Sequence, residues 1–371
     1  MPRRCAVTVL LSLTIGSYCA NAQTPAYTVQ IVPDPPVSGL VSQHVTNQVL
    51  PNGRFAVLSR LESGNAVQYV GNEAGWTVVQ PMDGFAYAVV DEVTDDGTLF
   101  GRSVTSLGDA RATFWPQGNV QAPQWALSGN FVPVSVNQQG VFAGYRAGPG
   151  PSDYAPATWQ NGTVTTLPTS AGYSQALVKR VNASGQSVGI AFPDSGGPPI
   201  RALRWSAGAV EVLPLPSGEV WDAQVSDLND DGWSVGNLWM PGTFDGTVLW
   251  RNGGVELIGP GFGVHEAMIS NTGDVLLGAY DDINATTMER LWRDGLLYES
   301  GELLTPGFGG QLHWMQKLLD DGRLIGVATV NGVDRNVLLT PIPAPATLSL
   351  MVFVALVSHR RRRSAPRVHH P

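Results

Sequence analysis

A short stretch that recurs along the chain constrains the fold more than any other feature. Its clearest copy is Leu228–Gly236, in which a turn glycine is followed four residues later by a second glycine between apolar flanks. The turn glycines of the seven copies are Gly53, Gly97, Gly140, Gly185, Gly232, Gly273 and Gly322. Successive turn glycines lie 41 to 49 residues apart. A period in the mid-forties that persists through seven copies is typical of repeat architectures.

Each copy predicts a small antiparallel sheet. An extended run leads into the Asn/Asp-rich turn with its glycine, which is a strong hairpin signal. The second strand contains the second glycine, which predicts either a bulge or a close approach of another backbone, as sheets packed face to face would need. The third strand ends in a tryptophan, 18 to 20 residues after the turn glycine in five copies: Trp115, Trp159, Trp205, Trp250 and Trp292. A ring at this fixed register would fill the gap between neighbouring units.

Four short strands per period predict an all-β fold, a seven-bladed β-propeller of four-stranded antiparallel blades. The last copy has three strand-like runs and no fourth, whereas Ala26–Val32 is a strand-like run without a blade of its own. We therefore expect this N-terminal strand to complete the last blade and to remove its exposed edge. An open solenoid is the rival architecture, and it would need no such exchange.

The repeat resembles the HAF family of extracellular bacterial repeats. The resemblance rests on the spacing of Val136–Gly144 and on the Ala/Thr-x-Trp ending seen in Ala157–Trp159. It covers residues 43–340 and departs from the family pattern because no copy carries His-Ala-Phe before the tryptophan. The resemblance implies a β-propeller and an extracellular location, and it implies no particular activity.

The first 22 residues are expected to be a secretory signal peptide. Arg3 and Arg4 precede the apolar run Ala6–Ile15, and Ala20–Ala22 forms an A-x-A cleavage site. Cleavage before Gln23 would leave residues 23–340 as the HAF-like propeller. The chain has two cysteines, and both lie inside the leader: Cys5 and Cys19.

The C-terminal part, residues 341–363, changes character abruptly. A proline-rich start leads into the apolar run Leu348–Val357 and then into four arginines. This order resembles a PEP-CTERM sorting signal, with Ala344 where the motif has glutamate. Its matching residues are Pro343, Pro345, Ala346, Thr347, Arg360, Arg361, Arg362 and Arg363.

A PEP-CTERM signal implies exosortase-type processing as a partner and delivery to the cell surface or extracellular matrix of a Gram-negative bacterium. The alternative is a plain C-terminal transmembrane anchor, for which the apolar run is short. Residues 364–371 would form a basic tail. Either interpretation gives the membrane as a transient or permanent partner.

The charge balance argues against two classes of partner. Residues 23–340 carry 15 basic and 30 acidic side chains, a net charge of −15. Nucleic-acid binding depends on neutralising phosphates, so this balance argues against it, and also against anionic lipid surfaces. A solubilising acidic surface is the simplest interpretation.

The motifs for chemistry are few. Three turns read Asp-Asp-Gly, and paired carboxylates there could hold calcium, although the spacing of a calcium loop is missing and a hairpin turn explains the residues. Sparse histidines predict no metal site, and no motif predicts a catalytic residue or a cofactor. Polar residues on the predicted inner strands of the last two blades are candidates for lining the channel and binding a ligand: His265, Glu266, His313, Gln316 and Lys317.

The first functional hypothesis is a non-enzymatic binding or adhesion module that is anchored at the surface or associated with the matrix. Its partner would be an extracellular polysaccharide or a surface protein. The second is a secreted propeller that hydrolyses glycans, for which Asp222, Glu266 and Asp320 are the candidate carboxylates. A structural spacer in the exopolysaccharide matrix is the third.

Overall fold

The structure, a computed structural model, describes residues 26–37, 41–125, 131–148, 154–194, 199–216, 222–240, 243–260, 267–281, 286–305 and 308–343. The predicted signal peptide and the apolar run Leu348–Val357 lie outside these residues. Within the described ranges, no helix has the length and apolar character needed to cross a membrane.

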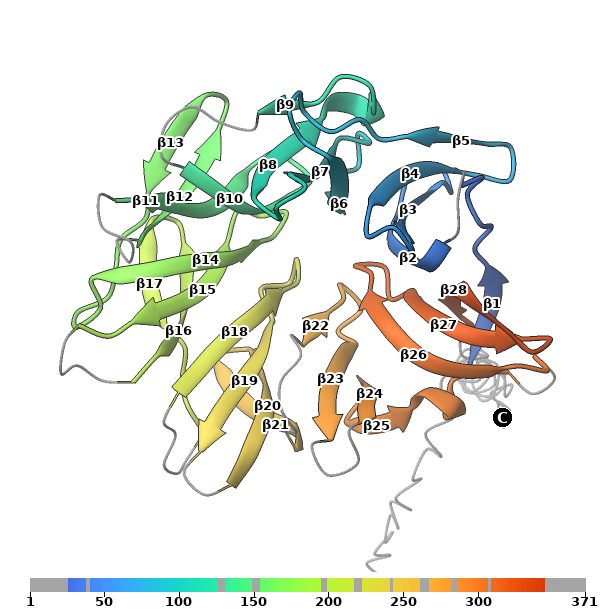
Figure 1. Ribbon diagram of the computed structural model, residues 1–371. Helices are drawn as coiled ribbons and strands as arrows, with labels where there is room; N and C mark the ends of the chain where they lie inside the picture. Colours follow the sequence, from blue (N-terminus) through green and yellow to red (C-terminus); the bar gives the residue numbers. More distant parts are fainter. Residues whose placement is uncertain are drawn as a thin grey trace, which may run out of the picture. The chain divides into compact units, whose positions relative to one another are not determined.

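The described residues form seven four-stranded antiparallel sheets arranged as the blades of a ring (Figure 1). In chain order, and from the inner to the outer strand of each blade, the first six blades are β2(Val41–Val49), β3(Phe55–Leu61), β4(Ala66–Asn72), β5(Gly75–Val78); β6(Tyr87–Val93), β7(Leu99–Val104), β8(Ala110–Trp115), β9(Gln124–Trp125); β10(Phe131–Val136), β11(Phe142–Ala147), β12(Tyr154–Gln160), β13(Thr163–Thr166); β14(Gln175–Val181), β15(Ser187–Phe192), β16(Arg201–Ser206), β17(Ala209–Val212); β18(Asp222–Leu228), β19(Ser234–Met240), β20(Thr243–Arg251), β21(Gly254–Pro260); β22(Met268–Ile269), β23(Val275–Asp281), β24(Thr286–Arg293), β25(Leu296–Glu299).

The seventh blade joins the two ends of the propeller. Its strands, from inner to outer, are β26(Gln311–Leu318), β27(Leu324–Val330), β28(Val333–Pro341) and the N-terminal β1(Tyr27–Ile31). β1 pairs antiparallel with β28, with Tyr27 opposite Pro341 and Ile31 opposite Val337. The predicted closure by an N-terminal strand is therefore confirmed, and the open solenoid is excluded. Two short 3-10 turns accompany the strands, Pro116–Gly118 and Ser300–Glu302.

Each inner strand turns into its neighbour in the same way. In the second blade, for example, Gly97 N–H donates to the Thr94 carbonyl, and Thr94 N–H donates to the Thr98 carbonyl, at 2.9 and 3.0 Å. Gly97 has φ of 81°, in the left-handed region that glycine enters without a steric cost. The same turn recurs after the inner strand in all seven blades.

The second glycine lies beside a bulge and close to another backbone, as predicted, but that backbone belongs to the same blade. A Cβ added at Gly189 would lie 1.9 Å from the Leu177 carbonyl oxygen, and one at Gly101 would lie 1.9 Å from the Val89 oxygen. Both oxygens belong to the inner strand of the same blade, not to a packed neighbouring sheet. The reason is a β-bulge in the inner strand, which brings its backbone close to the second strand at this register.

The tryptophans join neighbouring blades, as predicted. Trp115 and Trp250 are buried, at 0% and 1% exposure. The Trp115 indole N–H donates to the Gln80 carbonyl (2.9 Å), and the Trp250 indole donates to the Pro214 carbonyl (2.6 Å). Gln80 and Pro214 follow the outer strand of the preceding blade, so these two rings fill the gap between two blades and also hydrogen bond across it. The buried indole N–H of Trp159, in contrast, has no partner among the described residues.

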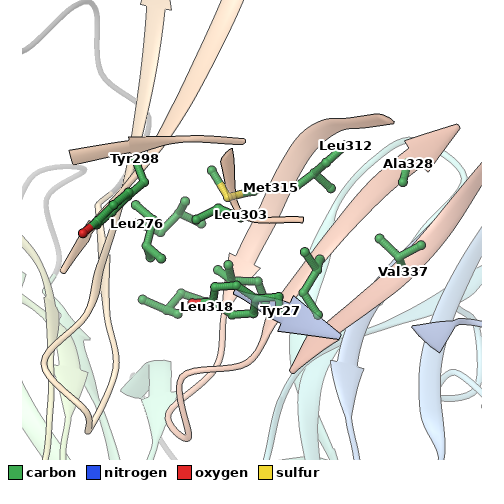
Figure 2. Close-up of a cluster of buried hydrophobic side chains, with 12 residues drawn as sticks. Tyr27, Leu276, Tyr298, Leu303, Leu312, Met315, Leu318, Ala328 and Val337 are labelled. Atoms are coloured by element: carbon green, nitrogen blue, oxygen red, sulfur yellow. The ribbon is translucent and has the colours of Figure 1, made fainter. Parts of the chain in front are cut away.

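Closure of the ring is built around Tyr27. Its side chain is fully buried in an apolar cluster that includes Leu303, Met315 and Leu318 (Figure 2). Its hydroxyl accepts a hydrogen bond from Arg293 (2.9 Å), and the Arg293 guanidinium also pairs with the buried Asp274. Burial raises the pKa of Tyr27 to about 12 despite the opposing charge of Arg293. The first strand is thus held by both apolar packing and a polar anchor.

Candidate functional site

A ring of seven side chains crosses the centre of the propeller. These residues stand five positions before the turn glycines and come one from each blade: Gln48, Glu92, Ser135, Arg180, Asp227, Met268 and Lys317. We call them the floor ring. In six blades a β-bulge in the inner strand immediately precedes this residue. Because a bulge re-aims the side chains that follow it, the bulges explain why one position per blade faces the channel.

A cavity of about 540 Å³ lies above the floor ring. Its walls are the last residues of the inner strands and the turns that follow them, from all seven blades. We call the end where these turns lie the mouth. Among the charged residues that line the cavity are six acids and three bases, in a volume that a small polar ligand can fill.

Arg180 holds the charged part of the floor ring together. Its guanidinium lies 3.1 Å from the Glu92 carboxylate and 3.2 Å from that of Asp227. Glu92 belongs to the second blade and Arg180 to the fourth, so the arginine passes the third blade, where the floor-ring residue is the small Ser135. The three side chains are only 16% to 30% exposed, which makes this a mostly buried ion-pair network.

Backbone amides of the next blade satisfy the same two carboxylates. Glu92 accepts a hydrogen bond from Val136 N–H (2.7 Å), and Asp227 accepts one from Ile269 N–H (2.9 Å). Burial raises the pKa of both carboxyls, while Arg180 and these hydrogen bonds oppose the rise. With their oxygens occupied in this way, Glu92 and Asp227 are fixed parts of the scaffold.

Lys317 completes the floor from the seventh blade. Its ammonium donates a hydrogen bond to the Asp91 carbonyl oxygen (3.0 Å) in the second blade. Burial lowers the pKa of Lys317, and the nearby Glu92 carboxylate opposes that change. The lysine therefore reaches across the first blade, much as Arg180 reaches across the third.

A second ring forms the rim of the mouth, two residues before the turn glycines: Pro51, Asp95, Gln138, Ala183, Asp230, Asn271 and Asp320. Several of these side chains accept a hydrogen bond from the preceding blade. Ala183 N–H donates to the Asp230 carboxylate and Asp230 N–H donates to the Asn271 side chain, both at 2.8 Å. Hydrogen bonds from a backbone N–H to a side chain of the next blade therefore link neighbouring blades at the rim.

Asp320, like Asp95, makes no side-chain hydrogen bond with the described residues of the preceding blade; its backbone carbonyl accepts Asn271 N–H instead (2.8 Å). Its carboxylate accepts no hydrogen bond from any residue that the structure describes, while its side chain faces the cavity. Burial, together with the nearby carboxylates of Asp227, Asp230 and Glu92, raises its pKa to about 6 against the opposing effect of Lys317. Asp320 is thus a free acceptor in an acidic part of the cavity.

Below the rim, asparagines link four consecutive blades. The Asn137 amide donates to the Asn182 carbonyl (2.8 Å), Asn182 to Asn229 (2.9 Å) and Asn229 to Ser270 (3.1 Å). The Asn182 side-chain oxygen also accepts Gln186 N–H of its own turn (2.9 Å). We call this series the asparagine ladder. It explains why an asparagine so often precedes the turn in the repeat.

The structure brings one of the predicted ligand-binding residues to this cavity. Lys317 lines it, whereas Gln316 occupies the unpaired position of the bulge, and its side-chain oxygen is buried without a partner among the described residues. His313 lies nearer the other end of β26 and contacts Thr329. His265 and Glu266 lie outside the described residues.

The two described candidates for glycan hydrolysis, Asp222 and Asp320, do not come together. Asp222 begins its inner strand and accepts Ile200 N–H (2.8 Å), whereas Asp320 follows the end of its own inner strand. The two therefore lie at opposite ends of the channel, separated by roughly 20 Å along the strand direction. Retaining or inverting hydrolysis needs carboxyls about 5 to 10 Å apart, so these two cannot act as a pair.

Metal binding finds no support in the described ranges. They contain no group of three or more histidine, cysteine, aspartate or glutamate side chains positioned to hold an ion. Two Asp-Asp-Gly turns use a carboxylate locally instead: Asp96 bonds Thr94 (2.6 Å), and Asp321 bonds Arg323. Of the predicted sorting residues, Pro343 is described and exposed, and the others lie outside the described residues.

No family model matches the chain, and no curated protein matches it. Among solved structures, it is similar to oligogalacturonate lyase from Vibrio parahaemolyticus, with a TM-score of 0.51 and 9% identity over 86% of this chain and 98% of that one. It is also similar to the β-propeller domain of the Trilobed protease from Pyrococcus furiosus, with a TM-score of 0.47 and 11% identity over 69% of this chain and 83% of that one. At such identities the likeness shows the propeller fold alone.

Proposed function

We propose that this protein is an exported, non-enzymatic binding module whose ligand occupies the cavity at the mouth of the propeller. The observation that carries the proposal is the contrast between floor and rim. The charged side chains of the floor are held by ion pairs and by backbone contacts, whereas Asp320 at the rim has an unfilled carboxylate. A rigid, polar cavity with a free acceptor suits recognition of a small polar group.

The proposed setting follows from the sequence. The signal peptide would export the chain, and the PEP-CTERM-like segment would present it to exosortase-type machinery or hold it in the membrane. The propeller would then stand at the cell surface or in the exopolysaccharide matrix. Fractionating cells that express the full chain would test this, and a cytoplasmic protein with an intact leader would contradict it.

Binding is tested with a glycan array and small polar amines, using residues 23–343. We expect the protein to retain a defined subset of ligands, and Asp320→Asn to lose it. Asp222→Asn is the matched control because Asp222 lies at the other end of the channel. Equal binding by the two variants would show that the ligand does not bind in the cavity.

One observation favours a second function, hydrolysis of a glycan. A carboxyl whose pKa lies near 6 in a cavity lined by other acidic side chains is the arrangement of a general acid. Asp320 would donate the proton to the leaving oxygen. However, its neighbours Glu92 and Asp227 are already engaged by Arg180. Release of reducing ends from polysaccharides, abolished by Asp320→Asn, would favour the hydrolase over the binding module.

A further inference from the structure

The two ends of the propeller leave it side by side. Tyr27 at the start of β1 pairs with Pro341 at the end of β28, and Ile342 N–H donates to the Ala26 carbonyl at 2.8 Å. Whatever precedes residue 26 and whatever follows residue 342 therefore begin at one point of the ring.

The strand register shows on which face this point lies. Leu318 at the end of β26 pairs with Leu324 at the start of β27, and the turn between them lines the cavity. Leu324 in turn pairs with Leu339, so β28 runs toward the mouth and ends there at Pro341. The turn between β27 and β28, in contrast, lies on the opposite face.

The exit point is close to the cavity as well as on its face. β28 is two strands away from β26, and β1 is three strands away. With neighbouring strands about 4.8 Å apart, the ends leave about 10 to 14 Å from the inner strand whose turn lines the mouth. A surface attached at this point would therefore lie on the side of the propeller where the cavity opens.

We infer that the cavity opens toward whatever the chain's ends are attached to, so that its ligand is a headgroup of the anchoring membrane rather than a molecule arriving from solution. The inference rests on the proposed anchoring and deepens it. Only residues 343–347 separate Ile342 from the apolar run at Leu348. Five residues span at most about 17 Å, so an anchored propeller would hold its mouth within that distance of the membrane.

The chemistry of the headgroup follows from the rim. Asp320 is an acceptor without a donor, and the acidic lining repels anionic phosphates that carry no positive group. A headgroup with an amine supplies donors and a positive charge to Asp320. An ethanolamine headgroup is therefore the expected class, and a glycerol phosphate headgroup, which brings no positively charged donor to Asp320, is not expected to bind.

The orientation is tested by labelling single cysteines on vesicles. Residues 23–347 followed by a histidine tag are attached to nickel-chelating vesicles, and each variant reacts with a large polymer-bound maleimide. Asp321→Cys reports on the mouth. Leu107→Cys is the control, because Leu107 is 90% exposed in the turn after β7, on the face opposite the mouth.

We expect attachment to slow labelling of Asp321→Cys by about tenfold and to leave labelling of Leu107→Cys unchanged. A flexible linker of about 30 residues after residue 347, which spans about 30 Å, should abolish the slowing. A small maleimide should label both sites equally on and off the vesicle. Equal slowing of the two sites by the large reagent, or slowing at Leu107 alone, would overturn the orientation.

The headgroup is tested on the same vesicles by exchanging phosphatidylcholine for phosphatidylethanolamine. Ethanolamine should slow labelling at Asp321→Cys by a further few-fold even with the small maleimide, and Asp320→Asn should abolish that extra effect. No effect of composition would overturn the headgroup assignment while leaving the orientation standing. If the protein binds soluble glycans and lipid composition does not change the labelling rate, the proposed binding module is supported and the ethanolamine headgroup is contradicted as its ligand.

Discussion

Arg180 illustrates how much the floor ring depends on a single residue. Replacing it with methionine would leave the Glu92 and Asp227 carboxylates mostly buried without their countercharge. Breaking a buried network in this way costs about 3 to 5 kcal/mol, whereas Arg102→Ala, which removes the exposed pair with Asp91, should cost at most about 1 kcal/mol. Urea unfolding of the two variants would check this, and similar losses would contradict the structural role of Arg180.

Substitution of the second glycine of the repeat gives a clearer stability prediction than substitution of the turn glycine. Gly189→Ala would place a Cβ against the Leu177 carbonyl oxygen, which cannot move without disturbing the bulge. We expect a loss of about 2 to 3 kcal/mol in the free energy of unfolding. Gly75→Ala is the control, because a Cβ there meets nothing within 4 Å, and it should be neutral or slightly stabilising.

Asp320 should make the stability of the fold depend on pH. Its pKa is about 6 in the folded protein against an ordinary value of 3.8, so the folded state binds more protons than the unfolded state between these values. Stability contributed by the protonated carboxyl is therefore lost as the pH rises through 6. Asp320→Asn should be more stable than the parent at pH 7.5, with a gain that shrinks toward pH 4.

Urea midpoints across this pH range would measure the effect. Asp95→Asn is the comparison, since it removes an exposed carboxylate at the equivalent rim position of the second blade. A constant difference between Asp320→Asn and the parent at all pH values would show that Asp320 does not titrate near 6.

At the scale of the element, the asparagine ladder predicts coupling between blades. Asn182→Ala removes the donor to the Asn229 carbonyl and the acceptor of Gln186 N–H, both in a buried place. Leaving such groups unsatisfied should cost about 1 to 3 kcal/mol. Asn119→Ala, which loses only a local exposed contact with Gln121, should cost much less by the same chemical-denaturation measurement.

The elements also show what the sequence could predict. Regular spacing of the turn glycines and of tryptophans such as Trp115 was sufficient for the blade count, because the glycine recurs in all seven units and the tryptophan in five. The unpaired run Ala26–Val32 was sufficient for closure. The floor ring was not predicted, because which residue faces the channel depends on the bulge: Lys317 lines the cavity, and Gln316 one position earlier does not. Alignment of the copies on their turn glycines would have revealed Glu92, Arg180 and Asp227 at one register.

For the whole molecule, the decisive contact is the one that closes the ring. Tyr27→Ala would empty a fully buried site and leave Arg293 without its hydroxyl partner, with an expected cost of about 3 to 5 kcal/mol. Tyr27→Phe keeps the ring and should cost about 1 kcal/mol. Thr28→Ala, on the exposed side of the same strand, should be nearly neutral. Thermal unfolding would rank the three, and an equal effect of Thr28→Ala and Tyr27→Ala would show that closure does not depend on the buried side.

The asparagine ladder spans the third to the sixth blade, and its equivalent positions in the seventh, first and second blades are Leu319, Leu50 and Thr94. Side-chain amides therefore link the third to the sixth blade, whereas the seventh, first and second blades lack these links. The second group includes the blade in which β1 pairs with β28. Local opening should therefore begin between β1 and β28, and backbone amides there should exchange with deuterium before those of the blades that the ladder links. A force applied to the C-terminus should separate these two strands before it unfolds any blade of the ladder.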